Sequence, residues 1–244
     1  MNEIRFENVS VYYQNDKSVI TALNDLSLSF EMGKFNVVIG KSGSGKTSLL
    51  RCLSGQAIYK GEILFNKENL SSLPVNKRKL SLVDQNIILY PNLTVYENLM
   101  FPLKVMKVEH ETADQKIKDI ASKLGFDCAL SRKPKNISLG QASRVSLARA
   151  FLKESDVYLF DEPFANLDNQ NKNEICDLIK KTLKKENKTA IFVTHNIPVA
   201  LSLADKIFVL DEGALLGEFT PKELLASKNK LVNDLLAEIK NEEN

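Results

Sequence analysis

The sequence predicts an α/β fold: a parallel sheet with helices on both faces, joined to a β-rich edge and interrupted by an inserted helical segment. Three patterns predict it. In the last part of the chain, short continuous apolar segments alternate with helical ones, which is typical of a parallel sheet covered on both faces. In the first third, apolar and polar residues alternate, as in half-buried antiparallel strands. Between them, from about residue 92 to residue 153, the pattern is helical.

The first third is expected to consist mainly of strands. Alternating segments run over 4–6, 9–13 and 26–30, and Met32-Gly33 forms a turn into an apolar, β-branched strand at 35–39. Leucines then recur at helical spacing up to Gly55, a helix stop. Further strands are expected over 62–65 and over 80–83, the second ending at Asp84-Gln85.

The remaining elements follow from caps and apolar periodicity. Thr112-Ala113-Asp114-Gln115 has the form of a capping box and predicts the start of a helix that stops at Gly125. A helix near Pro198, a helix cap at Thr220 and a C-terminal helix that reaches Ile239 are also expected. The later strands are expected over 157–160, 190–193 and 207–210, with a helix over 175–183.

Composition excludes several classes of protein. Hydrophobic residues make up 43% and charged residues 26%, which are globular values. Thirty-three Lys+Arg against 31 Asp+Glu leave a net charge of +2, so we expect no nucleic-acid partner. Three cysteines without a C-x-x-C pair predict reduced thiols and no zinc site. No run of residues has the length and apolarity of a membrane span, so any membrane role is expected to need a partner.

The most informative segment is the glycine-rich octet at residues 40–47. Gly40, Lys41, Ser42, Gly43, Ser44, Gly45, Lys46 and Thr47 fit the pattern G-x-x-x-x-G-K-[ST], with Ser48 directly after them. Because a strand precedes the octet and a helix follows it, backbone N–H groups and the helix N-terminus can converge on a phosphate. We expect Lys46 to reach the β and γ phosphates of a nucleoside triphosphate and the Thr47 hydroxyl to bind Mg²⁺.

Two further segments carry candidate chemistry. Asp161 and Glu162 end a predicted strand, where one carboxylate can hold Mg²⁺ and the next can activate water, although paired acids also occur as ordinary loop residues. Ser138 and Gln141 form a capping box at the start of a helix. The residues alone leave open whether this helix start is only capped or is offered to a phosphate.

These motifs together resemble the ATP-binding subunit of an ABC (ATP-binding cassette) transporter over nearly the whole chain. They occur in the family's order: an aromatic near the N-terminus, the octet at 40–47, Gln85, the signature Ser138-Leu139-Gly140-Gln141, the pair Asp161-Glu162, and His195. The resemblance implies a P-loop NTPase (RecA-like) core with an antiparallel β subdomain and an inserted helical subdomain. It implies a single domain over 1–244, with a β-rich edge and phosphate loop at 1–85, a helical insertion at 86–156, and the rest of the core with the C-terminal helices at 157–244.

The resemblance also implies residue roles. Tyr13 would stack on adenine, with Tyr12 as the competitor and a core aromatic as the alternative. Glu162, His195 and Gln85 would act in catalysis, and Thr47, Gln85 and Asp161 would hold the metal. Asp168 would communicate across a dimer; otherwise it is a helix N-cap.

In the family, two subunits pack head to tail, so that Ser138 and Gly140 of one close over ATP held by the other. The expected cofactors are ATP and Mg²⁺. The expected partners are a second ATPase subunit, integral-membrane permease subunits and an extracytoplasmic solute-binding protein, which places the chain at the cytoplasmic face of the cell membrane. The alternatives are a soluble ABC ATPase without a transport role and an ATP-binding regulatory module.

Two departures from the family's pattern qualify the comparison. Leu139 stands where the signature usually has glycine, and Ala142 and Ser143 replace longer polar residues, so slower hydrolysis or pairing with a more typical ATPase is a hypothesis. Segments 90–99, 132–135 and 160–168 resemble importer ATPases of the carbohydrate-uptake group. We expect this chain to lack the C-terminal regulatory domain of that group.

Overall fold

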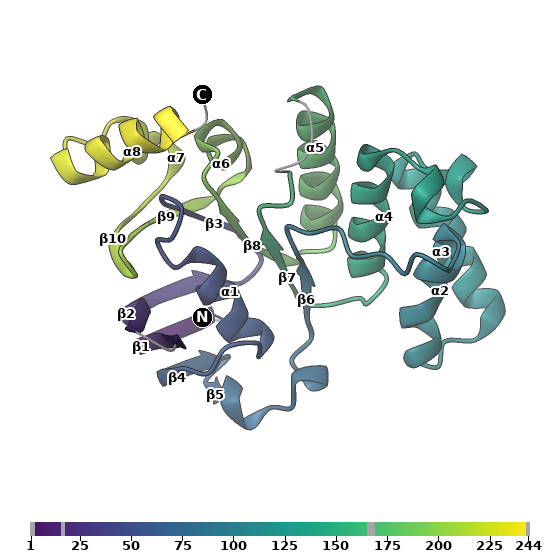
Figure 1. The fold of residues 1–244 in the computed structure, drawn as a ribbon, viewed down its shortest axis with the longest axis horizontal. Helices are drawn as coiled ribbons and strands as arrows, with labels where there is room; N and C mark the ends of the chain where they lie inside the picture. The colour runs from purple at the N-terminus through teal and green to yellow at the C-terminus, as the bar shows by residue number, and fades with distance from the viewer. Residues whose placement is uncertain (1–2, 16–17, 165–168, 243–244) are drawn as a thin grey trace.

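The strands form two sheets (Figure 1), seen in a computed structural model that describes residues 3–15, 18–164 and 169–242. One sheet is antiparallel, with strand order β2-β1-β4-β5. The other has the order β10-β9-β3-β8-β7-β6 and is parallel except for β10 at its edge. The predicted α/β class with an antiparallel part is therefore confirmed. The strands are β1 (Glu3–Asn15), β2 (Ser18–Glu31), β3 (Phe35–Ile39), β4 (Lys60–Phe65), β5 (Glu68–Asn69), β6 (Leu80–Val83), β7 (Val157–Asp161), β8 (Thr189–Thr194), β9 (Lys206–Asp211) and β10 (Ala214–Phe219).

Helices cover both faces of the parallel sheet. The helix α1 lies between this sheet and the antiparallel one, α5 and α6 lie on the opposite face, and α2 to α4 form a separate group at one end of the molecule (Figure 1). The helices are α1 (Lys46–Ser54), α2 (Val95–Val105), α3 (His110–Leu124), α4 (Leu139–Phe151), α5 (Asn169–Lys185), α6 (Ile197–Leu203), α7 (Pro221–Leu225) and α8 (Lys230–Glu242). Short 3₁₀ segments are η1 (Leu70–Ser72), η2 (Val75–Lys77), η3 (Asp127–Ala129) and η4 (Pro134–Asn136).

The central strands serve two separate cores. Because successive side chains of a strand point to opposite faces, a strand buried on both sides reads as a continuous apolar run. In β8, Phe192 packs with α5 and α6, whereas its neighbours Ile191 and Val193 pack with α1 and the antiparallel sheet. On the first face, the Phe192 ring stacks on that of Phe160, with centroids 4.1 Å apart and planes 9° apart. Burial is therefore concentrated in the strands that carry the candidate site at their ends.

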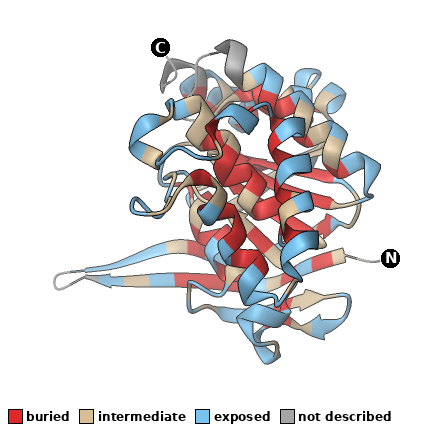
Figure 2. Ribbon diagram, turned by 90° about the vertical axis from the view of Figure 1, so that its right-hand side faces the viewer, coloured by how far each residue is buried: buried red, intermediate tan, exposed pale blue. Residues whose placement is uncertain are grey.

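The strands β1 and β2 form a long pair. Near Phe6 and Leu28 both strands pack into the core, whereas farther along they project from the body with mostly exposed residues (Figure 2). Tyr13 pairs with Ile20 of β2, and its side chain is partly buried against the core that β1 shares with α1.

The helical segment differs from the prediction at two helix starts. The helix α3 begins at His110, so Thr112 lies inside its first turn and is not a cap. The Gln115 amide binds Asp119 instead of turning back to the Thr112 backbone, which is why the predicted capping box is wrong. A real capping box that the sequence analysis did not identify, Thr94 with Glu97, starts α2. Ser138 and Thr220 cap their helices as predicted.

The C-terminal part adds a strand that the sequence analysis missed. The strand β10 is amphipathic only in part and lies at the sheet edge, where half-buried residues give a weak apolar signal. The predicted C-terminal helix is α8, which packs against α6 through the buried residues Val232, Leu235 and Ile239. Throughout the described part of the chain, every helix is too short or too polar to cross a membrane.

Candidate functional site

The segment at residues 40–47 is a tight loop that leads from β3 into α1. At Gly40, a Cβ atom would lie 2.2 Å from the Leu210 carbonyl oxygen, so only glycine fits there. Gly43 and Gly45 have φ angles of 83° and 98°, which side-chain-bearing residues rarely adopt. Gly45 is the N-cap of α1 and makes no side-chain cap bond. The loop therefore has the backbone form of an anion-binding turn at a helix start.

The loop is held from inside and from outside. Within it, the Ser44 amide donates to the Lys41 carbonyl oxygen at 3.1 Å. From outside, the Gly213 amide, in the turn between β9 and β10, donates to the Ser44 carbonyl oxygen at 3.1 Å. The Ser44 hydroxyl is buried and has no hydrogen-bond partner among the residues that the structure describes, so a polar group remains available inside the loop.

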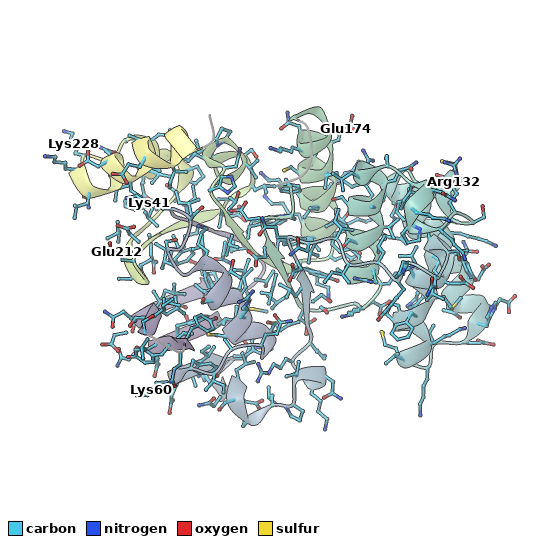
Figure 3. All side chains as sticks on the ribbon, viewed as in Figure 1. Lys41, Lys60, Arg132, Glu174, Glu212 and Lys228 are labelled. Carbon is cyan, nitrogen blue, oxygen red and sulfur yellow. The ribbon has the colours of Figure 1, made fainter. Side chains whose placement is uncertain are left out.

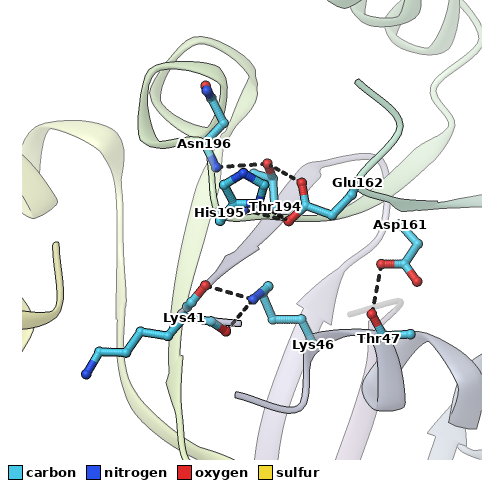
Figure 4. A network of polar contacts seen from close by, with 9 residues as sticks. Lys41, Lys46, Thr47, Asp161, Glu162, Thr194, His195 and Asn196 are labelled. Atoms are coloured by element: carbon cyan, nitrogen blue, oxygen red, sulfur yellow. Dashed lines mark hydrogen bonds and ion pairs between the residues drawn. The ribbon is translucent and has the colours of Figure 1, made fainter. Parts of the chain in front are cut away.

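Lys46 lies at the centre of the loop and is 7% exposed. Its ammonium donates to the carbonyl oxygens of Gly40 and Lys41, both at 2.7 Å (Figure 4). A buried cation costs free energy unless polar groups surround it, and these carbonyls provide that environment. The ammonium is thereby held inside the loop that the sequence analysis assigned to phosphate.

Thr47 links the loop to the first carboxylate of the acidic pair. Its hydroxyl donates to Asp161 Oδ1 at 3.0 Å (Figure 4). Burial raises the pKa of the Asp161 carboxyl, the Thr47 hydrogen bond opposes that shift, and the nearby acids Asp84 and Glu162 reinforce it. A hydroxyl and a carboxylate in contact provide oxygen donors of the kind that Mg²⁺ prefers.

Glu162 is held in an unusual backbone conformation. Its φ angle is 43°, in the left-handed region that costs a residue other than glycine about 1–2 kcal/mol. Its carboxylate accepts hydrogen bonds from the Thr194 hydroxyl at 3.0 Å and from the His195 amide at 2.8 Å, and it lies 2.8 Å from His195 Nδ1 (Figure 4). Strain of this kind persists where surrounding contacts fix it, and here the contacts come from the end of β8.

Sheet topology explains why residues far apart in sequence meet here. In a parallel sheet all carboxyl ends lie at one edge. Ile39 pairs with Thr194, and Asp161 pairs with Val193, so the loop, the acidic pair and His195 leave the sheet side by side. Gln85 follows β6, whose last residue Val83 pairs with Phe160, and its side chain is exposed.

The Tyr13 side chain also reaches the loop region. Its hydroxyl donates to Ser48 Oγ at 3.2 Å, in the first turn of α1, whereas Tyr12 is 45% exposed with Lys60 over its ring. The hydrogen bond puts the Tyr13 ring, and not that of Tyr12, next to the phosphate loop.

The signature lies apart from these residues. Ser138 is the N-cap of α4, which packs against β6, α2 and α3, while α1 packs against β6 to β8. Ser138 Oγ accepts from the Gln141 amide at 3.2 Å, and the Gln141 side chain accepts from the Ser138 amide at 3.1 Å. Ser138 is exposed, Leu139 is 52% exposed and Gly140 is half-buried, so this helix start faces outward.

With this geometry established, comparison with known proteins identifies the family. The sequence model of the ABC transporter family matches residues 23–165. The chain belongs to the ABC transporter family. The ATP-binding cassette MJ0796, solved as a dimer in a post-hydrolysis state bound to ADP and Pi, shares its fold with a TM-score of 0.82 and 27% identity, over 89% of this chain and 98% of that one.

Several curated relatives of this ABC chain are named as import ATP-binding proteins. A molybdate/tungstate import ATP-binding protein of Pyrococcus horikoshii is 37% identical over 87% of this chain and 60% of the relative. A glycerol-3-phosphate import ATP-binding protein of Bartonella bacilliformis is 36% identical over 92% of this chain and 64% of the relative. A trehalose/maltose import protein of Thermococcus litoralis is 36% identical over 84% and 57%. The chain thus spans about three fifths of the length of these relatives.

Some site residues of the ABC chain escaped the sequence analysis, and one expected residue cannot be placed. Asp168 lies outside the described residues. Thr194 was missed as a partner of Glu162, although its position directly before His195 was a usable signal. Asp84 was treated only as the end of a strand, yet it raises the pKa of Asp161. Across residues 3–15, 18–164 and 169–242, no three His, Cys, Asp or Glu residues form a metal-binding group.

Proposed function

We propose that this chain is the ATP-hydrolysing subunit of a solute importer. The observation that carries the proposal is the pair of contacts beside the phosphate loop: Thr47 with Asp161, and Glu162 with Thr194 and His195. The first is suited to a metal and the second to a general base, and both lie at the edge of the sheet where α/β proteins bind ligands.

The triphosphate of ATP is proposed to occupy the loop at 40–47. Backbone N–H groups of the loop and of the start of α1 can bind an anion there. They do not compete with a side-chain cap, because the N-cap residue Gly45 makes no side-chain hydrogen bond. Lys46 neutralises phosphate charge, and Tyr13 supplies an aromatic face for adenine. Ser42 and Lys41 complete the loop.

A Mg²⁺ ion would be held by Thr47 and Asp161, with Gln85 as a further ligand, and would supply charge neutralisation on the phosphate oxygens. Such a site does not need three His, Cys, Asp or Glu ligands. Mg²⁺ usually retains several water ligands and is bound by one or two carboxylates together with the substrate phosphates.

Hydrolysis is proposed to use Glu162 as general base. The Glu162 carboxylate takes a proton from water as the water oxygen attacks the γ phosphorus, and the bond to the bridging oxygen of ADP breaks. Thr194 and the His195 amide hold the carboxylate through hydrogen bonds. Because His195 Nδ1 lies 2.8 Å from Glu162, its other ring nitrogen is proposed to hydrogen-bond the γ phosphate.

A second copy or a related subunit is proposed to close the site. Ser138 and Gly140 form an outward-facing helix start that is remote from the chain's own phosphate loop, and the structural relative is dimeric. ATP held between the two subunits would then join them, and loss of the γ phosphate would release them.

Permease subunits are proposed to dock beside Gln85. Large apolar side chains are exposed in the segment that follows Gln85 and on and just after α2: Ile88, Tyr90, Phe101, Val105 and Met106. The Tyr90 and Phe101 ring centroids lie 5.1 Å apart, so the two rings form one surface. Exposed apolar groups of this kind mark interaction sites. Such docking would put the chain at the cytoplasmic face of the membrane, and an extracytoplasmic solute-binding protein would deliver the solute.

The proposal covers import but no particular solute. The relatives are named for molybdate or tungstate, glycerol phosphate, and trehalose or maltose, which share no chemistry that this chain's residues would select. We propose the single-domain arrangement over 1–244, with its helical insertion at 86–156, as the unit that performs the hydrolysis.

Replacement of Glu162 by Gln tests the function. The variant keeps the size of the side chain and removes the base, so hydrolysis is expected to fall by about 10²–10⁴-fold while ATP still binds. Phosphate release measures the first effect, and calorimetry with gel filtration measures binding and ATP-dependent dimerisation. Glu68→Gln, an exposed carboxylate on β5, is the matched control. Unchanged hydrolysis in Glu162→Gln would show that the base is assigned wrongly.

A further inference from the structure

The phosphate loop contains a second lysine whose side chain points away from the nucleotide position. Lys41 contributes its carbonyl oxygen to Lys46, but its own ammonium extends in the opposite direction (Figure 4). That ammonium forms an ion pair with Glu238 of α8. Lys41 lies at the end of the molecule that α8 occupies (Figure 3). A residue of the candidate site is thus joined to the C-terminal helix.

We infer that Glu238 is a positioning residue for the phosphate loop, acting through Lys41 on Lys46. The inference rests on the proposed function and adds a residue of the C-terminal helix to the same site. Fixing the Lys41 side chain fixes the carbonyl oxygen that receives both Lys46 Nζ at 2.7 Å and the Ser44 amide at 3.1 Å.

The helix that carries Glu238 is itself anchored. Val232, Leu235 and Ile239 are at most 3% exposed and pack into the core beside α6. Ile239 is the immediate neighbour of Glu238, so the carboxylate is placed by a buried contact and not by a free chain end. This anchoring reduces the entropy that an exposed ion pair normally loses when it forms.

The charges around Lys41 favour the same arrangement. Glu238 is the main cause that raises the pKa of the Lys41 ammonium, and Asp211 and Glu212 add to it. Together these charges favour the course of the Lys41 side chain toward α8.

The contact contributes little to global stability. The Lys41 side chain is 33% exposed and that of Glu238 is 54% exposed, and pairs of this kind carry small energies. Its consequence is local, because it acts on Lys41, whose carbonyl oxygen together with that of Gly40 receives the Lys46 ammonium.

Glu238→Gln is the direct test, measured as ADP and ATP affinity by calorimetry and as KM and kcat of hydrolysis by the full chain. We expect a weakening of nucleotide binding of about two- to fivefold, the range that an exposed ion pair carries, with kcat nearly unchanged. Asp234→Asn, one turn earlier on α8 and also exposed, is the matched control and should bind nucleotide as the wild type does.

Two further measurements test whether Glu238 affects nucleotide affinity through its ion pair with Lys41, and not through a change in the fold or through direct repulsion between its charge and the phosphates. In a Lys41→Gln background, Glu238→Gln should change affinity no further, because the effect passes through Lys41. At about 1 M salt, where screening acts within about 3 Å, the difference between wild type and Glu238→Gln should shrink.

Four outcomes would overturn the inference. Tighter nucleotide binding in Glu238→Gln would mean that its charge merely repels phosphate. Equal affinities for wild type and variant, or fully additive losses in the double variant, would mean that Lys41 does not transmit an effect. A wild-type chain without nucleotide affinity would refute the proposed function and this inference together, whereas the other three outcomes leave the proposed function intact.

Discussion

The phosphate loop and the signature are both starts of helices, yet they are supported in opposite ways. Three elements hold the loop from outside: Asp161 in β7, Gly213 after β9 and Glu238 in α8. The hydrogen bonds of Ser138 with Gln141 and Ala142 stay within its own helix. One region is assembled by the fold of the whole chain, and the other is complete locally and turned outward.

The two helix starts also differ in what they leave open. The helix α1 begins at Gly45 without a side-chain cap, so its first N–H groups keep their capacity for an anion. The helix α4 begins with a full capping box. This contrast supports a site in which the loop receives the phosphates and the signature approaches them from another subunit.

Gly40→Ala should give the largest effect, because it strikes the region that depends on distant contacts. The new Cβ would lie 2.2 Å from the Leu210 carbonyl oxygen and 2.5 Å from Ser44 Oγ, so β9 and the loop must separate. We expect a loss of about 1–3 kcal/mol in the free energy of unfolding and no measurable ATP binding, by denaturant titration and calorimetry.

Gly43→Ala is the matched control for this substitution. A Cβ there meets no described atom within 4 Å. The only expected loss of stability comes from placing alanine at a φ angle of 83°. If Gly43→Ala destabilised the protein as much as Gly40→Ala, outside support of the loop would not be the property that matters.

Asp161→Asn should change stability by an intermediate amount. In protein free of metal it should raise the free energy of unfolding, whereas Gly40→Ala lowers it. Burial raises the pKa of this carboxyl, so the folded protein holds the proton more tightly than the unfolded chain does. Its contribution to stability is greatest below the unfolded pKa and falls as pH rises through the folded pKa. Asn keeps an acceptor for Thr47 without the buried charge.

The expected result is a Tm at pH 7 in EDTA that is higher than that of wild type by about 2–4 °C, the shift that 1 kcal/mol gives in a domain of this size. The difference should vanish at about pH 3, where both side chains are neutral. Addition of Mg-ATP should raise the Tm of wild type more than that of the variant. A lower Tm in the variant at pH 7 would contradict the assigned cost of burial.

Leu139→Gly should give the smallest change in stability, and it tests the signature at the start of α4. Leu139 is 52% exposed in the first turn of α4, so its removal should cost less than about 1 kcal/mol by thermal unfolding. If its side chain crowds a facing nucleotide, turnover should rise in phosphate-release assays. Turnover that stays constant, or wild-type turnover already at the level of ATPases with the usual signature, would exclude this role. Ala142→Gly, in the same helix, is a control for helix destabilisation.

Local sequence predicted the parts of the molecule whose structure has local causes. Residue spacing was enough to predict the glycines of the loop, the cap at Ser138 and the continuous apolar strands, because backbone conformation and burial depend on a few neighbouring residues. Thr112 gave a wrong prediction for the same reason: the local pattern of a capping box was present, but α3 begins at His110 and Thr112 lies inside its first turn.

The missing parts depend on contacts between distant segments. No spacing rule connects Lys41 with Glu238, or Glu162 with Thr194, because only the order of strands in the sheet brings them together. The edge strand β10 was missed because half-buried residues lack the strong apolar contrast that marks central strands.

The division of each central strand between two cores restricts how this gene can change in length. Deletion of a single residue within β8 would send Phe192 toward α1 and Val193 toward α5, and it would rotate His195 away from Glu162 in the same event. Loss or gain of codons should therefore be tolerated in the exposed turns and eliminated within β3, β7 and β8. In these strands, the same residue spacing determines both which side chains pack in each core and how the site residues are oriented.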